Sequence, residues 1–421
     1  MNEFVFEKYT FDHESYRADF YYRLGEYSFR ETVHFQQSNN GYDVDVLSRA
    51  LKLAHLVIGV SYYKTFPTSH ITFMDQQIDS WQANFLNNVY QEGLSQFAYE
   101  NNLTREDLAF FKETSELVER AAVYSGQGTL SLQSGGKDSL LSAMLLDKQQ
   151  QAFDSMYVAN SESHPALIDT LGEQLYVVRR DIDKAALATA AENGAKNGHI
   201  PITYIISSIA LVQSVLLNKN TVLLSIGHEG EEPHAMIGNL GVTHQWSKTW
   251  SAEQLLAGYV QRYIAENIRV GSPLRKYSEL RIAQLFVEHA WGDYGHSFSS
   301  CNKINYQQGN DNTVLKWCGE CPKCANSFLL FAPFVSAREL TELFGGQDLF
   351  AKPLLVDTFK GLLGIDGFEK PFECIGEIDE LRKAYELKQN GYASLPFYVP
   401  ASDFSLMAEY PYQRWTDELI A

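Results

Sequence analysis

The six-residue stretch SGGKDS is the part of this sequence whose residue types and spacing point most directly to chemistry. It consists of Ser134, Gly135, Gly136, Lys137, Asp138 and Ser139, and it joins an apolar run to a run typical of a helix. The two glycines let the backbone turn tightly and approach an anion without a side chain in the way. The helix would aim its free N–H groups and the positive end of its dipole at the same place. With two hydroxyl donors, a cation in Lys137 and a magnesium ligand in Asp138, the stretch predicts a binding site for a pyrophosphate.

A second chemical pattern is the cysteine cluster WCGECPKC. Its residues Cys318, Cys321 and Cys324 are each separated by two residues. Such turns point thiolates at one ion, and a structural zinc ion takes four ligands in a tetrahedron. Cys301 is the natural fourth ligand, and Cys374 is the alternative. Four thiolates leave no open position for water, so we expect zinc in a structural role.

Alternating strand and helix patterns must position these residues. From about residue 125, short apolar runs typical of strands (TLSLQ, SMYVAN, LYVVRRD and TVLLSIG) alternate with runs typical of helices. This order predicts a mostly parallel sheet covered on both faces, and ligands of such sheets bind outside the carboxyl ends of the strands. Ser134, Asn160, Arg180 and Gly227 lie at those ends. Arg180 and its neighbour Arg179 could pair there with a substrate phosphate or carboxylate, or form ordinary ion pairs.

The chain divides by pattern into three predicted domains. Residues 1–124 are rich in aromatic residues, and their patterns predict antiparallel strands followed by helices at 44–64 and 106–119. We expect this part to be a separate α+β module. Residues 125–300 would form the α/β domain, and residues 301–421 a zinc-bound cysteine region with a helical extension.

The composition fits a globular enzyme and limits its partners. The chain has 421 residues, 45% of them hydrophobic, and a formal net charge of −18 at pH 7. Because phosphate contacts need clustered lysine and arginine, this charge argues against a nucleic-acid partner. No apolar run reaches the roughly 18–20 residues that span a bilayer, and the first residues lack the pattern of a signal peptide. We therefore expect a cytoplasmic protein that binds no membrane, and the oligomeric state stays open.

The SGGKDS stretch resembles the SGGxDS loop of the ATP-pyrophosphatase (PP-loop) superfamily at all six positions. The resemblance implies a fold of the adenine nucleotide alpha hydrolase-like kind. It also implies that the loop holds ATP and Mg²⁺, that ATP is cleaved between its α- and β-phosphates, and that a substrate oxygen is adenylated. The cysteine cluster is similar to that of a PP-loop relative, 7-cyano-7-deazaguanine synthase (QueC), which narrows the resemblance to a QueC-like branch.

Seven further segments resemble one family, the ATP-dependent UDP-N-acetylmuramoyl-L-alanyl-L-glutamate epimerases (MurL). From Arg49 to Glu377 they are RALKLAHLVIGVSYYK, AKNGHIPIT, HQWSK, SELRIAQLF, SCNK, WCGECPKC and PFECIGE. The resemblance implies that the terminal L-glutamate of UDP-MurNAc-L-Ala-L-Glu becomes D-glutamate in peptidoglycan precursor synthesis, while ATP becomes AMP and pyrophosphate. It also implies a UDP-sugar dipeptide as the substrate and a functional link to a MurD-type ligase.

The resemblance assigns no acid or base, so the candidates rest on residue chemistry. Moving a proton at the glutamate Cα favours groups that titrate near neutral pH, above all histidine. The candidates are His199, His228, Glu229, His244, Lys248 and Cys374. Glu229 could equally bind magnesium, and each histidine or the thiol could instead be structural.

Three other functions remain open at this stage. A QueC-like ligase would adenylate a carboxylate and pass it to ammonia, using the same loop and zinc site. A tRNA thiolation enzyme would need a basic face and catalytic cysteines, against which the net charge of −18 and the shortage of free cysteines weigh. A non-catalytic nucleotide sensor would have a damaged loop, whereas Ser134, Asp138 and Ser139 are all present.

Overall fold

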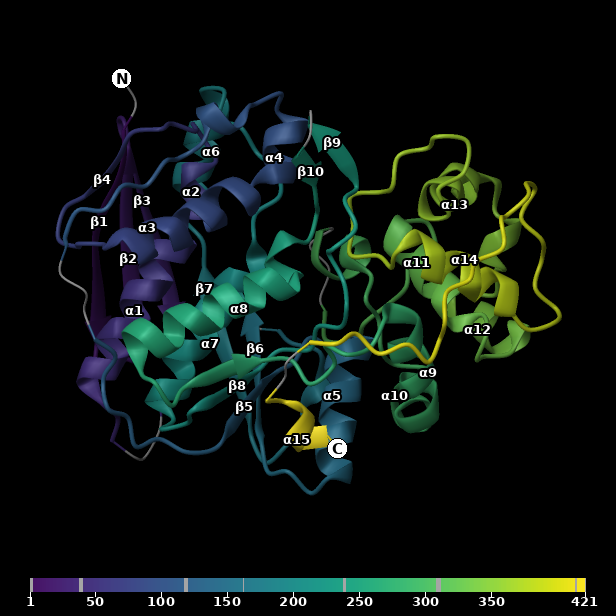
Figure 1. The fold of residues 1–421 in the computed structure, drawn as a ribbon. Helices are drawn as coiled ribbons and strands as arrows, with labels where there is room; N and C mark the ends of the chain where they lie inside the picture. Colours follow the sequence, from purple (N-terminus) through teal and green to yellow (C-terminus); the bar gives the residue numbers. More distant parts are fainter. Residues whose placement is uncertain are drawn as a thin grey trace.

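A computed structural model shows a large twisted sheet with helices on both faces and a smaller helical lobe beside it (Figure 1). The structure describes residues 3–37, 41–116, 120–161, 163–237, 240–307, 312–412 and 415–420. Within these ranges nine strands form the main sheet in the order β11-β8-β5-β6-β7-β3-β2-β1-β4. Their bounds are β1 Phe4–Asp12, β2 Arg17–Leu24, β3 Tyr27–His34, β4 Ile71–Phe73, β5 Thr129–Leu132, β6 Asp154–Ala159, β7 Leu175–Asp181, β8 Thr221–Leu223 and β11 Arg269–Gly271.

The five strands from β11 to β7 are all parallel. They include the four runs from which the sequence predicts strands, so the prediction of an α/β protein with a mostly parallel sheet is confirmed. The connections from β5 to β6, from β7 to β8 and from β8 to β11 carry α-helices, whereas the connection from β6 to β7 carries only the 3₁₀ turn Ala166–Ile168. The carboxyl ends of these strands therefore meet along one edge of the sheet, where the SGGKDS loop follows β5.

The N-terminal strands continue this sheet. Strand β3 pairs antiparallel with β7, with Thr32 opposite Asp181, and β2 and β1 extend the sheet outward. The expected N-terminal module is therefore not separate from the α/β part, because its strands cover the edge that β7 would otherwise leave unpaired. The predicted boundaries near residues 124 and 300 stay a prediction.

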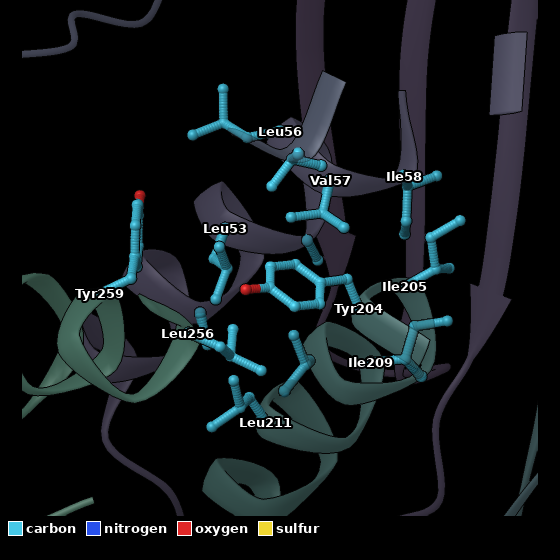
Figure 2. Close-up of a cluster of buried hydrophobic side chains, with 14 of the residues drawn as sticks. Leu53, Leu56, Val57, Ile58, Tyr204, Ile205, Ile209, Leu211, Leu256 and Tyr259 are labelled. Atoms are coloured by element: carbon cyan, nitrogen blue, oxygen red, sulfur yellow. The ribbon is translucent and has the colours of Figure 1, made fainter. Parts of the chain in front are cut away.

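One face of the sheet is covered by helices from both halves of the chain. Helices α1 (Val44–Ile58) and α7 (Ile202–Leu216) pack against each other, and α8 (Trp250–Tyr259) lies beside them (Figure 2). Tyr204 of α7 is buried in the middle of this cluster, and its hydroxyl donates to the carbonyl oxygen of Ala252. Further elements around this part are α2 Val60–Tyr63, α3 Ser80–Asn87, α4 Ser95–Glu100, α6 Lys184–Glu192 and the hairpin β9 Ala235–Ile237 and β10 Leu240–Val242.

A second buried core joins the opposite face to the C-terminal lobe. Helix α5 (Lys137–Lys148) packs on α9 (Glu279–His289), and α9 packs on α11 (Pro322–Phe331) and α14 (Ile378–Leu387). The remaining helices are α10 Trp291–Tyr294, α12 Ala337–Leu343, α13 Val356–Leu362 and α15 Asp417–Ile420. This packing fixes the lobe against the edge that carries the SGGKDS loop.

The C-terminal segment returns from the lobe to the sheet. After α14 the chain runs back in largely irregular conformation, drawn in yellow, and α15 lies against α5 (Figure 1). The segment brings Tyr410 and Tyr412 against His228, in the stretch of chain that follows β8. Among the residues described, no helix combines the length and apolar character that a membrane crossing needs.

Candidate functional site

The SGGKDS loop forms the turn between β5 and α5. Gly135 has a φ of +75°, a conformation that L side chains rarely adopt. A Cβ atom there would also lie 2.6 Å from Cδ1 of Leu315, in the segment between two cysteines of the cluster. Gly136 precedes the first residue of α5 in extended conformation, so the free N–H groups of the helix open onto the loop. The backbone thus needs glycine at the position where an anion would approach.

The two serines of the loop hold its shape. The Ser134 amide donates to Oγ of Ser139 at 3.2 Å, and the two hydroxyl oxygens are also 3.2 Å apart. The Gly136 amide donates to Oγ of Ser134 at 3.3 Å. The two hydroxyls therefore form hydrogen bonds within the loop. They lie where a phosphate oxygen could take over these hydrogen bonds.

Lys137 and Asp138 form a buried charge group with a residue from α9. Nζ of Lys137 donates to Oδ1 of Asp138 at 2.6 Å and to Oε2 of Glu279 at 2.7 Å. Burial works against the charged carboxylate of Asp138, yet Lys137 and the more distant lysines hold the pKa of Asp138 below its ordinary value. Burial raises the pKa of Glu279, and its buried Oε1 has no hydrogen-bond partner. An unpaired carboxylate oxygen beside Asp138 is an oxygen ligand for a cation such as Mg²⁺.

Two further lysines approach this group from other elements. Nζ of Lys248 donates to Oε2 of the buried Glu229 at 3.0 Å. Nζ of Lys323, in the first turn of α11, donates to the carbonyl oxygen of Cys374. The charges of both lysines help to lower the pKa of Asp138. Burial raises the pKa of the Cys374 thiol, and the same two lysines work against this rise. The loop carboxylate and the thiol therefore share one positively charged neighbourhood.

The four cysteines of the predicted metal site lie together. Sγ of Cys301 is 3.7 Å from Sγ of Cys321, and Sγ of Cys324 is 3.6 Å from Cys318 and 3.5 Å from Cys321. All four sulfur atoms lie within 4.8 Å of one another. Zinc–sulfur distances of about 2.3 Å in a tetrahedron place sulfurs roughly 3.8 Å apart, so the donor set fits zinc. Cys374 is not a member of this group.

Comparison with known protein families shows the family to which this chain belongs. The MurL N-terminal domain matches residues 1–272, and the MurL C-terminal domain matches residues 297–394. The chain belongs to the MurL family. The N-terminal family domain includes all nine described strands of the main sheet, antiparallel and parallel, in agreement with their continuous pairing.

Three relatives are named UDP-N-acetyl-alpha-D-muramoyl-L-alanyl-L-glutamate epimerase. The protein from Salinispora tropica is 34% identical over 94% of this chain and 87% of its own length. The protein from Xanthomonas oryzae pv. oryzae is 33% identical over 82% of this chain and 75% of its own length. The protein from a Micromonospora species is 32% identical over 90% of this chain and 85% of its own length. This MurL family member is accordingly an epimerase, an enzyme of the isomerase class.

In this MurL chain, two of the predicted histidines and a third one form a neutral group near Lys248. The ring centroids of His199 and His244 are 4.2 Å apart, and His234 lies next to His244. Burial, together with the positive charges of Lys64 and Lys248, lowers the pKa of His199 to about 4. Burial and the neighbouring histidines lower the pKa of His244 to about 2. Both imidazoles are therefore unprotonated at neutral pH, and their lowered pKa values make them weak bases.

Two predicted residues have other surroundings. Nδ1 of His228 is 2.6 Å from the Tyr412 hydroxyl, and its ring stacks on Tyr410 at 3.4 Å between centroids. His228 thus anchors the returning C-terminal segment to the stretch of chain that follows β8. Arg180 is buried, and its guanidinium donates to Glu31 at 2.6 and 3.1 Å, so it forms an ion pair inside the protein. Of the two interpretations of Arg180, a substrate contact or an ordinary ion pair, the structure supports the ion pair.

Sequence reasoning missed three residues at the site. Glu279 lies in SELRIAQLF directly after the N-cap Ser278, Lys323 lies between two cysteines, and Glu373 precedes Cys374. Each stood inside a segment that we quoted for its resemblance, but side-chain type alone gave no reason to separate it from a surface charge. Only the packing of α9 on α5, and of α11 on α9, brings Glu279 and Lys323 near Asp138.

Proposed function

We propose that this chain inverts the terminal L-glutamate of UDP-MurNAc-L-Ala-L-Glu to D-glutamate for peptidoglycan precursor synthesis. We also propose that ATP drives the inversion through an acyl-adenylate, with release of AMP and pyrophosphate. The observation that carries the ATP proposal is the SGGKDS loop at the carboxyl end of β5, with carboxylates and lysines gathered around it. The names of the family relatives support the epimerisation and the substrate.

Adenylation answers the main chemical difficulty of the reaction. The α-proton of a free glutamate is hard to remove because the resulting carbanion would lie next to a carboxylate that is already negative. Converting that carboxylate to an acyl-adenylate removes its charge and makes the carbonyl a better electron sink. A base can then take the α-proton, and a proton delivered to the opposite face inverts the centre. Hydrolysis of the anhydride releases AMP and makes the sequence effectively irreversible.

The residues around the loop suit the pyrophosphate and the α-phosphate of ATP. The amides of the loop and Lys137 would hold the pyrophosphate oxygens. Asp138 and the unpaired oxygen of Glu279 would hold Mg²⁺, which supplies positive charge to the phosphates when it is bound. Lys248 and Lys323 would stabilise the α-phosphate and the negative oxygen that develops when the α-proton leaves.

We also propose that Cys301, Cys318, Cys321 and Cys324 bind one structural zinc ion. The sulfur separations of 3.5–3.7 Å support a closed tetrahedral site. The segment between Cys301 and Cys318 contacts the nucleotide loop, because the Tyr306 hydroxyl donates to the carbonyl oxygen of Ser134 at 3.3 Å. Zinc would therefore fix a wall of the ATP site and take no part in the proton transfer.

The proposed reaction has consequences for partners and for the alternatives. A UDP-muramoyl dipeptide is the substrate, and a MurD-type ligase that adds L-glutamate would supply it. A cytoplasmic location stays a prediction. Membership of the MurL family favours epimerisation over QueC-like amidation, which uses the same loop. An amidating ligase would consume ammonia and leave the α-proton in place.

The ATP proposal is tested by exchange between labelled pyrophosphate and ATP. We expect exchange that requires magnesium and UDP-MurNAc-L-Ala-L-Glu together, because adenylation is reversible while the adenylate is bound. UDP-MurNAc-L-Ala, which has no glutamate, is the matched control and should give no exchange. Epimerisation of the substrate in the complete absence of ATP would contradict the proposal.

A further inference from the structure

A compact group of three polar side chains lies beside the lysines of the ATP site. A ring nitrogen of His244, a carboxylate oxygen of Glu373 and Sγ of Cys374 all lie within 4.8 Å of one another. The residues come from two distant parts of the chain, the segment before α8 and the segment before α14. No pairing of strands or packing of helices requires these three side chains to lie together, so their grouping needs an explanation of its own.

The hydrogen bonds of His244 define which nitrogen can accept a proton. Nδ1 of His244 lies 2.6 Å from Oε1 of Gln96. An amide oxygen only accepts, so Nδ1 carries the hydrogen and the lone pair of the neutral ring lies on Nε2. Gln96 therefore orients the ring and keeps Nε2 as the basic atom.

Glu373 is fixed in a different way. Its Oε1 accepts from Nδ2 of Asn302 at 2.9 Å and from the backbone amide of Cys374 at 3.0 Å. These bonds hold the backbone of Cys374 in place. The carbonyl oxygen of Glu373 is also near Nε2 of His234, at 3.3 Å, and accepts from Nε2 of Gln245 at 3.2 Å. Glu373 thus connects the segment before α14 to the histidine group.

The thiol has two cations next to it. Burial raises the pKa of the Cys374 thiol, and the negative charges of Glu373 and Glu229 act in the same direction, while Lys248 and Lys323 offset part of this rise. The two lysines also act on Asp138 in the nucleotide loop. A thiolate formed at Cys374 would therefore be stabilised by the same charges that approach the ATP site.

We propose that Cys374 is the catalytic residue that takes the proton from one face of the glutamate Cα, and that His244 acts through it as a positioning residue. This inference rests on the proposed ATP-dependent epimerisation and names the group that works on the carbon. Cys374 stood among six candidates in the sequence, and the cluster with His244 and the two lysines is what distinguishes it.

The thiol of Cys374 first loses its proton to solvent, so the S–H bond breaks and its electron pair stays on sulfur, next to the charges of Lys248 and Lys323. The thiolate then takes the α-proton of the activated glutamate, and the C–H electron pair moves into the enolate of the acyl-adenylate. A second group donates a proton to the opposite face of Cα. That group regains a proton from solvent, and Cys374 ends the cycle as the thiol.

The short separation within the cluster shows why a second group is needed. Reacting atoms approach to about 3–3.5 Å, so two groups on opposite faces of one carbon are roughly 6–7 Å apart. The three cluster atoms lie within 4.8 Å, too close to hold Cα between them. His244, Glu373 and Cys374 therefore serve the same face.

A metal ion is the competing occupant of such a group. One histidine, one carboxylate and one thiolate match the three protein ligands of many catalytic zinc sites. Two lysines acting on the thiol repel a divalent cation, and for this reason we favour proton transfer. The two interpretations differ in the metal content of the pure protein.

The test separates adenylation from proton exchange in one variant. In Cys374→Ser we expect deuterium uptake at Cα from heavy water to fall at least about 100-fold, because the hydroxyl does not ionise like a thiol. Pyrophosphate–ATP exchange that depends on UDP-MurNAc-L-Ala-L-Glu should stay within about threefold of wild type. Cys374→Ala, which lacks any proton carrier, gives the same comparison if the serine variant does not fold.

Each other outcome overturns a defined claim. Normal deuterium uptake in Cys374→Ser would remove the catalytic role, and so would equal loss of both activities in a folded variant. Two zinc ions per wild-type chain, with one lost in Cys374→Ser, would replace proton transfer by metal binding. Absence of substrate-dependent exchange in the wild type would overturn the proposed function first and the role of Cys374 with it.

The positioning role of His244 has its own readout. In His244→Gln the ring that Gln96 holds beside the thiol is replaced, so the surroundings of the thiol change and the pH profile of deuterium uptake should move. The profile of pyrophosphate–ATP exchange should not move, because adenylation does not use the thiol. Parallel shifts of both profiles would mean that His244 acts on the whole site and not through Cys374.

Discussion

At the scale of single residues, the site depends on buried charges that balance one another before any ligand binds. Lys137 is almost fully buried, and its two carboxylate partners, Asp138 and Glu279, allow it to stay charged there. The pKa of Lys137 is raised by these partners against the effect of burial. Oε1 of Glu279 has no hydrogen-bond partner, so the negative charge of this group is not fully compensated without a cation.

Asp138 gives the sharpest residue-scale prediction. Asp138→Asn should lower AMP formation at least about 100-fold, because it removes a magnesium ligand and a partner of Lys137. Asp147→Asn is the matched control, since Asp147 is exposed near the other end of the same helix. Measuring AMP by chromatography checks both variants. Wild-type turnover in Asp138→Asn would mean that the loop does not hold ATP.

At the scale of elements, sequence periodicity predicted the parallel strands and most helices near the site, including α5 and α7. It failed at residues 106–119, where a helix was predicted. The structure has only a short 3₁₀ turn at Arg105–Asp107 and then irregular chain to residue 116, and residues 117–119 lie outside the described ranges. Phe111 is buried there against Phe73 and Tyr90, so tertiary packing of one aromatic overrides the helical pattern.

The pairing of elements was the part that the sequence did not predict. The N-terminal strands carry no local signal for joining β7, because strand partners are selected by long-range packing. The four cysteines were predictable from spacing, but the contact of their segment with the nucleotide loop was not. Leu315 is an ordinary leucine in the sequence, and only the fold places it against Gly135.

The zinc proposal is tested at this same scale. We expect about one zinc ion per chain in the purified protein, measured by atomic emission. Cys321→Ser should lose the metal and much of its solubility, because Cys321 is the N-cap residue of α11 and the metal would tie this helix to the segment on the nucleotide loop. Ser300→Ala, beside the same segment, should keep the metal. A well-folded wild type without metal would remove the zinc proposal.

At the scale of the whole molecule, buried neutral histidines connect stability to pH. Burial lowers the pKa of His55 to about 4, and the pKa values of His199 and His234 are also lowered to about 4 by burial. In the unfolded chain such residues titrate near 6.5. The unfolded state therefore binds more protons between these values, and stability is lost as pH falls from 6.5 toward 4.

The fully buried His55 permits a direct test of this linkage. Its share of the loss is up to about 3 kcal/mol in the free energy of unfolding at acid pH. In His55→Gln, urea unfolding between pH 6.5 and 4 should show a pH slope reduced by up to one proton. His296→Gln is the control, because the His296 side chain is exposed, and this variant should keep the pH slope of the wild type. An unchanged slope in His55→Gln would contradict the prediction.

One incubation in heavy water tests the central claim most directly. It contains the purified protein, ATP, magnesium and UDP-MurNAc-L-Ala-L-Glu, and it is followed by mass spectrometry and chiral analysis of the released glutamate. We predict D-glutamate carrying one deuterium at Cα, with AMP and pyrophosphate formed in the same tube and only when substrate is present. D-glutamate without deuterium, or deuterium uptake without AMP, would contradict ATP-driven inversion at this site.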